Sequence, residues 1–135
     1  MKYHLLILSS LILLFTACES GNNNSEAYFT KGLENIRYGE YNEALMQFDE
    51  VLKIEPNNSE AYYHRGNCYM NLRQYNIAID EYNEAIKINE SYADAISNKG
   101  QAYFYLKDYV NACKYFQKAH DLGKPNMEDK LRHCN

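Results

Sequence analysis

The chain has 135 residues, enough for one domain, and a formal net charge of −4 from 14 Lys and Arg against 18 Asp and Glu. Its basic residues do not cluster, which argues against nucleic-acid binding because that function usually requires a basic face. Tyrosine is frequent, with 14 residues, and tryptophan is absent. A tyrosine ring packs while its hydroxyl reaches water or a partner, so this composition favours half-buried helix faces.

The first element in the chain is an apolar run from Leu5 to Phe15 that is interrupted only by two serines. It is shorter than the roughly 20 residues that a membrane-spanning helix needs, and it is typical of the apolar region of a secretory signal peptide. The run ends in Phe15-Thr16-Ala17-Cys18, which resembles the lipobox of bacterial lipoproteins. The resemblance implies a signal peptide over residues 1–17 and a lipid on the sulfur of Cys18. An ordinary signal peptide or a single membrane anchor is the alternative.

Residues 18–25 are predicted to be a flexible linker, because the stretch from Glu19 to Ser25 has almost no apolar residue. Several acyl chains would hold the protein firmly on a membrane, since each buried methylene contributes about 0.8 kcal/mol. The lipoprotein resemblance implies a place in the bacterial cell envelope. Glu19 stands where an aspartate would resemble a plasma-membrane retention signal, which favours the outer membrane. The side of that membrane is left open.

From about residue 25 the sequence repeats with a period of 34 residues. Several columns keep one residue type in all copies, among them Gly32, Gly66 and Gly100; Tyr41, Tyr75 and Tyr109; and Ala44, Ala78 and Ala112. Another column is aromatic, with Phe48, Tyr82 and Phe116. A period of this length predicts a stack of supersecondary units, each of which buries its apolar face on its neighbours.

Each copy divides into two helical patterns separated by short polar breaks. The first helices are expected at about 25–38, 59–72 and 93–106, and the second at about 41–54, 75–88 and 109–122. Breaks this short force neighbouring helices to be antiparallel. A glycine inside a helix costs about 1 kcal/mol relative to alanine. The glycine column therefore predicts close crossing of another helix backbone.

The pattern resembles the tetratricopeptide repeat family. The second copy matches it most closely, through Tyr62, Gly66, Tyr69, Tyr75, Ala78, Tyr82 and Ala85. The resemblance covers about residues 25–126 and implies an all-α fold, an α-solenoid of three antiparallel helix pairs. The repeat domain is placed at 26–126, with repeats at about 25–58, 59–92 and 93–126.

The remaining residues, 127–135, are predicted to form a short capping stub. Met127 and Leu131 lie four residues apart, so they can pack back on the last repeat as two helical turns. A stub of this size covers only part of that face. We therefore consider that the surface near Phe116 and Cys113 is an association site for a second copy or a partner, with full coverage by the stub as the alternative.

The other cysteines and the polar residues carry no chemistry that the sequence identifies. Cys68 and Cys113 fall at helical positions and are predicted to be packed thiols. An exported protein permits a Cys113–Cys134 disulfide as the alternative. The sequence has no phosphate-binding glycine loop, nucleophile elbow or zinc-protease helix. We therefore expect no enzyme activity, no cofactor and no metal site.

The resemblance also implies a binding site, because the first helix of each repeat in this family lines a concave, peptide-binding groove. Carried onto this sequence, that groove is lined by Phe29, Leu33, Ile36, Arg37, Tyr63, His64, Asn67, Met70, Asn71, Asn98, Gln101, Phe104 and Tyr105. The three asparagines can donate to and accept from a peptide backbone. Tyr63, Phe104 and Tyr105 are expected to anchor apolar side chains.

Some family members hold a peptide's C-terminal carboxylates with Lys and Arg in this groove. At those places this chain has Phe29, Leu33, His64, Asp94 and Asn98, so the carboxylate clamp is missing. The groove should prefer neutral or basic apolar segments. The sequence thus predicts a membrane-anchored adaptor that binds protein segments. Its rival is a self-associating structural lipoprotein that uses the open end of the third repeat.

Overall fold

A computed structural model describes residues 24–132 and 134. The predicted signal peptide, Cys18 and most of the predicted linker lie outside these residues. The last two residues of that linker, 24 and 25, belong to the first helix, and Ser25 is buried. In the part of the chain that is described, no helix is long and apolar enough to cross a membrane.

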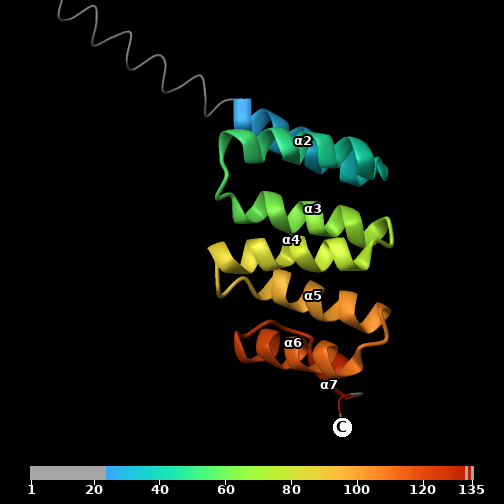
Figure 1. The fold of residues 1–135 in the computed structure, drawn as a ribbon. Helices are drawn as coiled ribbons and strands as arrows, with labels where there is room; N and C mark the ends of the chain where they lie inside the picture. The colour runs from blue at the N-terminus through green and yellow to red at the C-terminus, as the bar shows by residue number, and fades with distance from the viewer. Residues whose placement is uncertain (1–23, 133, 135) are drawn as a thin grey trace, which may run out of the picture.

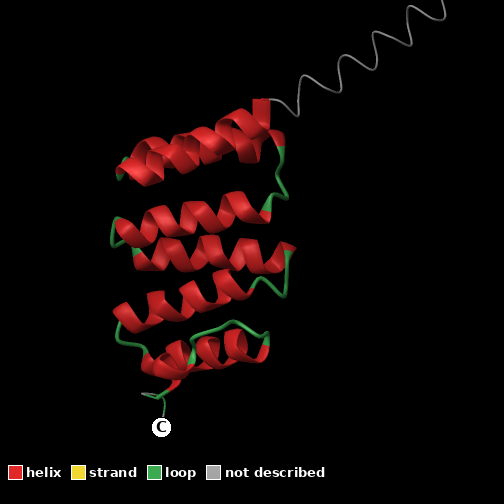
Figure 2. Ribbon diagram, turned by 180° about the vertical axis from the view of Figure 1, so that it is seen from behind, coloured by secondary structure: helices red, strands yellow, loops and turns green. Residues whose placement is uncertain are grey.

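The described chain is helical, without strands, and its helices follow one another down a stack (Figure 1). The first helix covers residues 24–38. It is followed by α2 (Tyr41–Ile54), α3 (Ser59–Asn71), α4 (Tyr75–Ile88), α5 (Ala93–Tyr105), α6 (Tyr109–Asp121) and the single turn α7 (Glu128–Leu131). The view from behind shows the same order, with short loops between neighbours (Figure 2). The predicted all-α solenoid of three helix pairs is confirmed, and the predicted helix ends are correct to within about one residue.

The turn inside each repeat depends on one left-handed residue. Gly39, Arg73 and Lys107 occupy the same column of the repeat and have φ of 77°, 59° and 64°. Each donates its backbone N–H to a carbonyl three residues back at 3.0 Å, which closes the end of the first helix of the pair. A side chain in this conformation costs about 1 kcal/mol, so the first repeat has the least strained turn.

The glycine column is explained by aromatic rings rather than by backbone crossing alone. A Cβ atom on Gly66 would lie 2.5 Å from Cε1 of Tyr82, and one on Gly32 would lie 2.7 Å from Cζ of Phe48. At Gly100 the two nearest atoms belong to the ring of Phe116, at 2.8 and 2.9 Å, and the backbone oxygen of Ala112 comes third, at 3.1 Å. The expected approach of a second helix is therefore an approach of its aromatic side chain, seated in the notch that each glycine leaves.

Polar side chains also connect the helices, and the position of Arg65 in the repeat is the clearest case. The Arg65 guanidinium on α3 donates to Asp49 of α2 at 2.8 Å and to Glu81 of α4 at 2.6 Å. Burial raises the pKa of Glu81, and the charge of Arg65 opposes that rise. In the third repeat Lys99 replaces Arg65 and instead lies 4.1 Å from the ring centre of Tyr115. Arg65 thus joins the first two repeats and the two helices of its own repeat, whereas Lys99 contacts only the second helix of its own repeat.

The C-terminal stub packs on the last repeat, as predicted. Met127 is 1% exposed, within a cluster with Ile96, Ala112, Phe116 and Ala119. The helical part of the stub is a single helical turn rather than two, because the chain changes direction at Pro125 and Asn126 and the helix begins only after them. Phe116 is only 3% exposed, so the stub covers most of this side chain, although Phe116 and Cys113 still line a hollow beside it.

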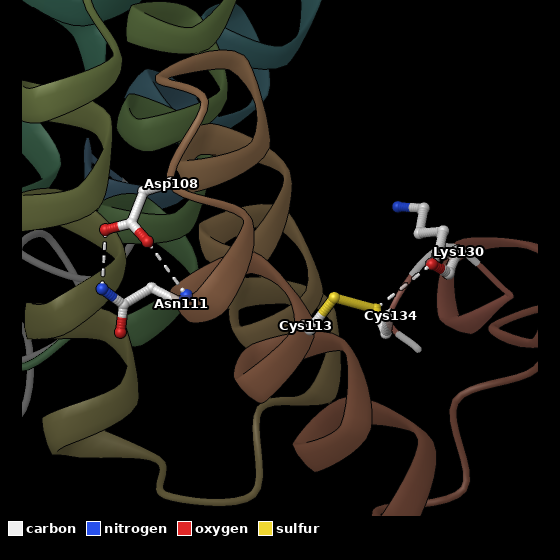
Figure 3. The surroundings of a disulfide bond; sticks show 5 residues. All are labelled: Asp108, Asn111, Cys113, Lys130 and Cys134. Atoms are coloured by element: carbon white, nitrogen blue, oxygen red, sulfur yellow. Dashed lines mark hydrogen bonds between the residues drawn. A yellow bond between two sulfur atoms is a disulfide. The ribbon is translucent and has the colours of Figure 1, made fainter.

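A disulfide fixes this stub. Cys113 of α6 and Cys134 are bonded, and the prediction that Cys113 is a packed thiol is therefore wrong (Figure 3). Comparing equivalent positions of the three repeats could not reveal this bond, because the partner cysteine, Cys134, lies beyond the last repeat. Cys68 is the free, buried thiol that the sequence predicted. Burial raises the pKa of Cys68 to about 12, which makes it unreactive.

Candidate peptide-binding groove

The first helices of the three repeats share one hollow of about 410 Å³, which we call the groove. Its lining is amide, aliphatic and aromatic: Ile36, Asn67, Met70, Asn71, Tyr82, Asn98, Gln101 and Tyr105. All of these except Tyr82 were predicted from the sequence. α2 contributes no lining residue, so the groove belongs to the first helix, α3 and α5, with one contribution from α4.

Tyr82 enters the groove lining through its hydroxyl. The hydroxyl donates to Oδ1 of Asn67 at 2.8 Å, and Nδ2 of Asn98 donates to the same oxygen at 2.9 Å. Because both donors satisfy this oxygen, Asn67 can offer only its amide N–H groups to a ligand. Asn98 keeps its carbonyl oxygen as an acceptor. The network thus fixes the direction in which two of the three predicted asparagines can bind a peptide backbone.

Three predicted groove residues instead form an aromatic cluster between the first two repeats. Phe29 and Phe48 lie 5.5 and 5.6 Å from the ring of His64, and Tyr63 lies 5.0 Å from it. Tyr63 also packs 5.0 Å from Tyr92. Periodicity alone does not separate such interhelical aromatics from ligand-facing ones. Phe29 additionally lines a separate polar hollow near the N-terminal ends of the first helix and α3.

This cluster stands where the family's carboxylate clamp would bring positive charge. Burial lowers the pKa of His64, although Glu60 opposes the shift. The imidazole is therefore neutral at pH 7 and supplies no cation. The aromatic cluster thus brings no positive charge of its own to this end of the groove.

The remaining predicted residues are accessible. Leu33 is 38% exposed and Arg37 is exposed, but neither is among the residues that line the groove. Phe104 and Tyr105 are 41% and 52% exposed. Tyr105 stacks on Tyr75, with 5.0 Å between ring centres.

One acidic residue near the groove has a cationic partner. Lys124, from the loop after α6, forms an ion pair with Asp94 at the start of α5. This pair could not be predicted from the period, because Lys124 follows the second helix of the last repeat. Glu26 and Glu60 stay unpaired among the described residues, and both line the polar hollow next to Phe29.

Beyond Gln101 the groove continues into two adjoining, mostly apolar hollows, which together we call the end pocket. The first, of about 220 Å³, is lined by Gln101, Phe104, Phe116, Asp129 and Lys130. It shares three of these residues with a neighbouring hollow of about 350 Å³. That second hollow is completed by Tyr109, Ala112 and the disulfide of Cys113 and Cys134. Phe116 and Cys113 mark the surface that the sequence suggested as an association site, but the contribution of Asp129, Lys130 and Cys134 from the stub was not predicted.

Sequence comparison identifies the family. Two models described as tetratricopeptide repeat match residues 59–92 and 93–126, and one described as TPR repeat matches residues 37–73. Together they span 37–126, two thirds of the chain. This chain is a tetratricopeptide repeat protein. No curated protein matches its sequence.

Solved tetratricopeptide domains have the same fold. The first such domain of Spaghetti (RPAP3), bound to the HSP90 peptide SRMEEVD, has a TM-score of 0.78 at 26% identity, covering 83% of this chain and 90% of that chain. The first domain of human RPAP3 has a TM-score of 0.76 at 26% identity, with 82% and 89% covered. The Arabidopsis OM64 domain has a TM-score of 0.78 at 24% identity, with 84% and 98% covered.

Proposed function

We propose that this tetratricopeptide protein is a membrane-anchored adaptor that binds peptide segments of a protein partner in its groove. The observation that carries the proposal is the groove itself. It is an open hollow along three repeats, lined by amides and apolar side chains. A tetratricopeptide domain of similar fold, the first one of Spaghetti, was solved with an HSP90 peptide. Groove-lining amides suit the backbone of an extended segment.

The groove chemistry favours a neutral or basic apolar segment rather than an acidic one. The peptide of the Spaghetti structure ends in Glu-Glu-Val-Asp. This chain has no lysine or arginine in the groove lining and has a neutral His64 beside it. We therefore expect little affinity for an acidic peptide of that kind.

Membrane anchoring rests on Cys18 and the preceding apolar run. The Cys113–Cys134 disulfide supports export, because disulfides persist in oxidising compartments such as the bacterial periplasm and cell surface. The proposed location is thus the bacterial envelope, with the lipid of Cys18 in the outer membrane. The linker would place the groove close to the bilayer surface.

Self-association is the rival function. The feature that suggested it was an uncovered face near Phe116, and that residue is buried under Met127 and α7. No other observation favours a homodimer, and it is kept as an outcome of the test.

The test is a crosslinking capture from intact cells with the full-length protein, Cys18→Ala and Asn71→Ala/Tyr105→Ala. The control is Met46→Ala, which changes a side chain that is 57% exposed on α2, outside the groove. The proposal predicts one partner that is captured by wild type and by the Met46 control and is lost with the groove variant. It predicts that Cys18→Ala fails to receive lipid. Recovery of only a second copy from all variants would replace the adaptor with the self-associating protein.

A further inference from the structure

The end pocket has the size and lining of a site for a single large side chain. Its larger hollow is about 350 Å³, near the lower end of the range for small-ligand pockets, about 300–1,000 Å³. A cavity of about 150 Å³ already accepts a benzene molecule. The wall is mostly apolar, and its polar groups are Gln101, the Asp129 carboxylate and one cation. Phe104 and Tyr109, with 5.4 Å between their ring centres, form the aromatic side of the opening.

That cation is Lys130, whose ammonium lies 4.9 Å from the ring centre of Phe116. Among residues 24–132 and 134, no carboxylate lies within ion-pair distance of the Lys130 Nζ. The adjacent carboxylate, that of Asp129, pairs with Arg132 instead. Burial lowers the pKa of Lys130, and the charge of Lys124 adds to this. A half-buried ammonium without a counter-ion gains most from a carboxylate brought in by a ligand. Lys130 thereby supplies the positive charge that the groove lacks.

The disulfide holds this arrangement in place. Lys130 belongs to a one-turn helix, which has no stability of its own because isolated short helices do not form in water. The bond between Cys113 and Cys134 ties that turn to α6, and both sulfur atoms line the pocket. The Cys134 sulfur also lies 3.5 Å from the Lys130 carbonyl oxygen (Figure 3). Without the bond, the pocket loses one wall and its cation together.

We propose that the end pocket selects the partner segment, taking one aromatic or large aliphatic side chain that is followed closely by a carboxylate on Lys130. The inference rests on the proposed function, because the pocket adjoins the groove through Gln101 and extends it beyond the third repeat. The bound segment is then neutral or basic over the first two repeats and ends in an apolar residue beside an acidic group.

The experiment uses three small probes on the purified, isotope-labelled full-length chain, followed by NMR chemical shifts. N-acetyl-phenylalanine carries both the ring and the carboxylate, N-acetyl-phenylalanine amide lacks the charge, and N-acetyl-alanine lacks the ring. The first should bind saturably and shift the resonances of Phe104, Tyr109 and Lys130. Removing either the ring or the charge should weaken binding at least about threefold, as expected for an exposed to half-buried charge contact.

Three variants test the residues. Lys130→Gln should weaken N-acetyl-phenylalanine about threefold and leave its amide unchanged. Cys113→Ser/Cys134→Ser should abolish the response to all probes. Cys68→Ala is the matched control, because Ala102 stands at its position in the third repeat, and it should bind as wild type does.

Equal binding of acid and amide, or Lys130→Gln equal to wild type, would overturn the inference. Probe-induced chemical shift changes that appear only at Asn67 and Asn98 would overturn it as well. So would changes at the end pocket that depend on protein concentration in the absence of any probe, because they would indicate that a second copy binds there. Failure of this test leaves capture from the groove unaffected. Conversely, if wild type captures no partner through the groove but binds the probes normally, the adaptor is rejected and the pocket is kept.

Discussion

Replacing Gly66 with alanine should destabilise the protein even though alanine is the better helix former. The new Cβ would lie 2.5 Å from Cε1 and 2.8 Å from Cδ1 of Tyr82. The Tyr82 ring is fully buried, so it cannot swing away into solvent. Overpacking of this kind costs about 1–3 kcal/mol. Any outward shift of the ring also weakens the bond from its hydroxyl to Asn67, worth about 1 kcal/mol.

The gain in helix propensity offsets about 1 kcal/mol of this cost, which leaves a net loss of about 1–3 kcal/mol in the free energy of unfolding. Urea denaturation followed by circular dichroism measures it as a lower midpoint at unchanged slope. Asn83→Ala, on the exposed surface of α4, is the control and should be neutral or slightly stabilising. A Gly66→Ala midpoint equal to or above that of wild type would refute the reasoning that the glycine column exists to seat aromatic rings.

Three further predictions follow from the packing. Arg65→Met should cost about 3 kcal/mol in urea denaturation at pH 7, because it leaves the buried carboxylate of Glu81 unpaired. Since burial raises the pKa of Glu81, the folded chain holds that proton more tightly than the unfolded chain does, so this cost is full above the folded pKa and fades as pH falls through it. A cost that is independent of pH between 7 and 4 would contradict this. Lys107→Gly should stabilise the protein by about 0.5–1 kcal/mol and so raise its thermal midpoint, because glycine adopts the left-handed φ of 64° without strain. A lower midpoint would show that the lysine is not strained. Reducing the disulfide, whose cysteines are 21 residues apart, should lower the stability of the third repeat by about 3 kcal/mol. The loss is measured as faster amide hydrogen exchange in α6 and α7. Unchanged exchange would show that the stub is held without the disulfide.

The helices and their pairing could be predicted because the repeat supplies three independent readings of each position. Gly32, Gly66 and Gly100 share one register, and so do the aromatic rings that fill their notches. Asn67, Asn71 and Asn98, which were named from the same period, all line the hollow that we call the groove. Where every copy obeys one packing geometry, the period alone locates the residue.

The predictions were incomplete where that redundancy ends. Tyr63 and His64 have the helical register of groove residues, but they pack on other rings, and a period cannot distinguish two neighbouring faces that are both aromatic. After Gly123 no repeat carries the register forward. The sequence therefore could not place Lys124 on Asp94, or Lys130 in the end pocket.

The central claim is that a protein segment lies in the groove, and site-specific photo-crosslinking in intact cells tests it most directly. A photoreactive amino acid is placed at Asn71, which lines the groove, or at Met46 on α2. The account predicts one crosslinked partner from position 71 and none from position 46. Crosslinks to a second copy alone, or equal capture from both positions, would contradict it.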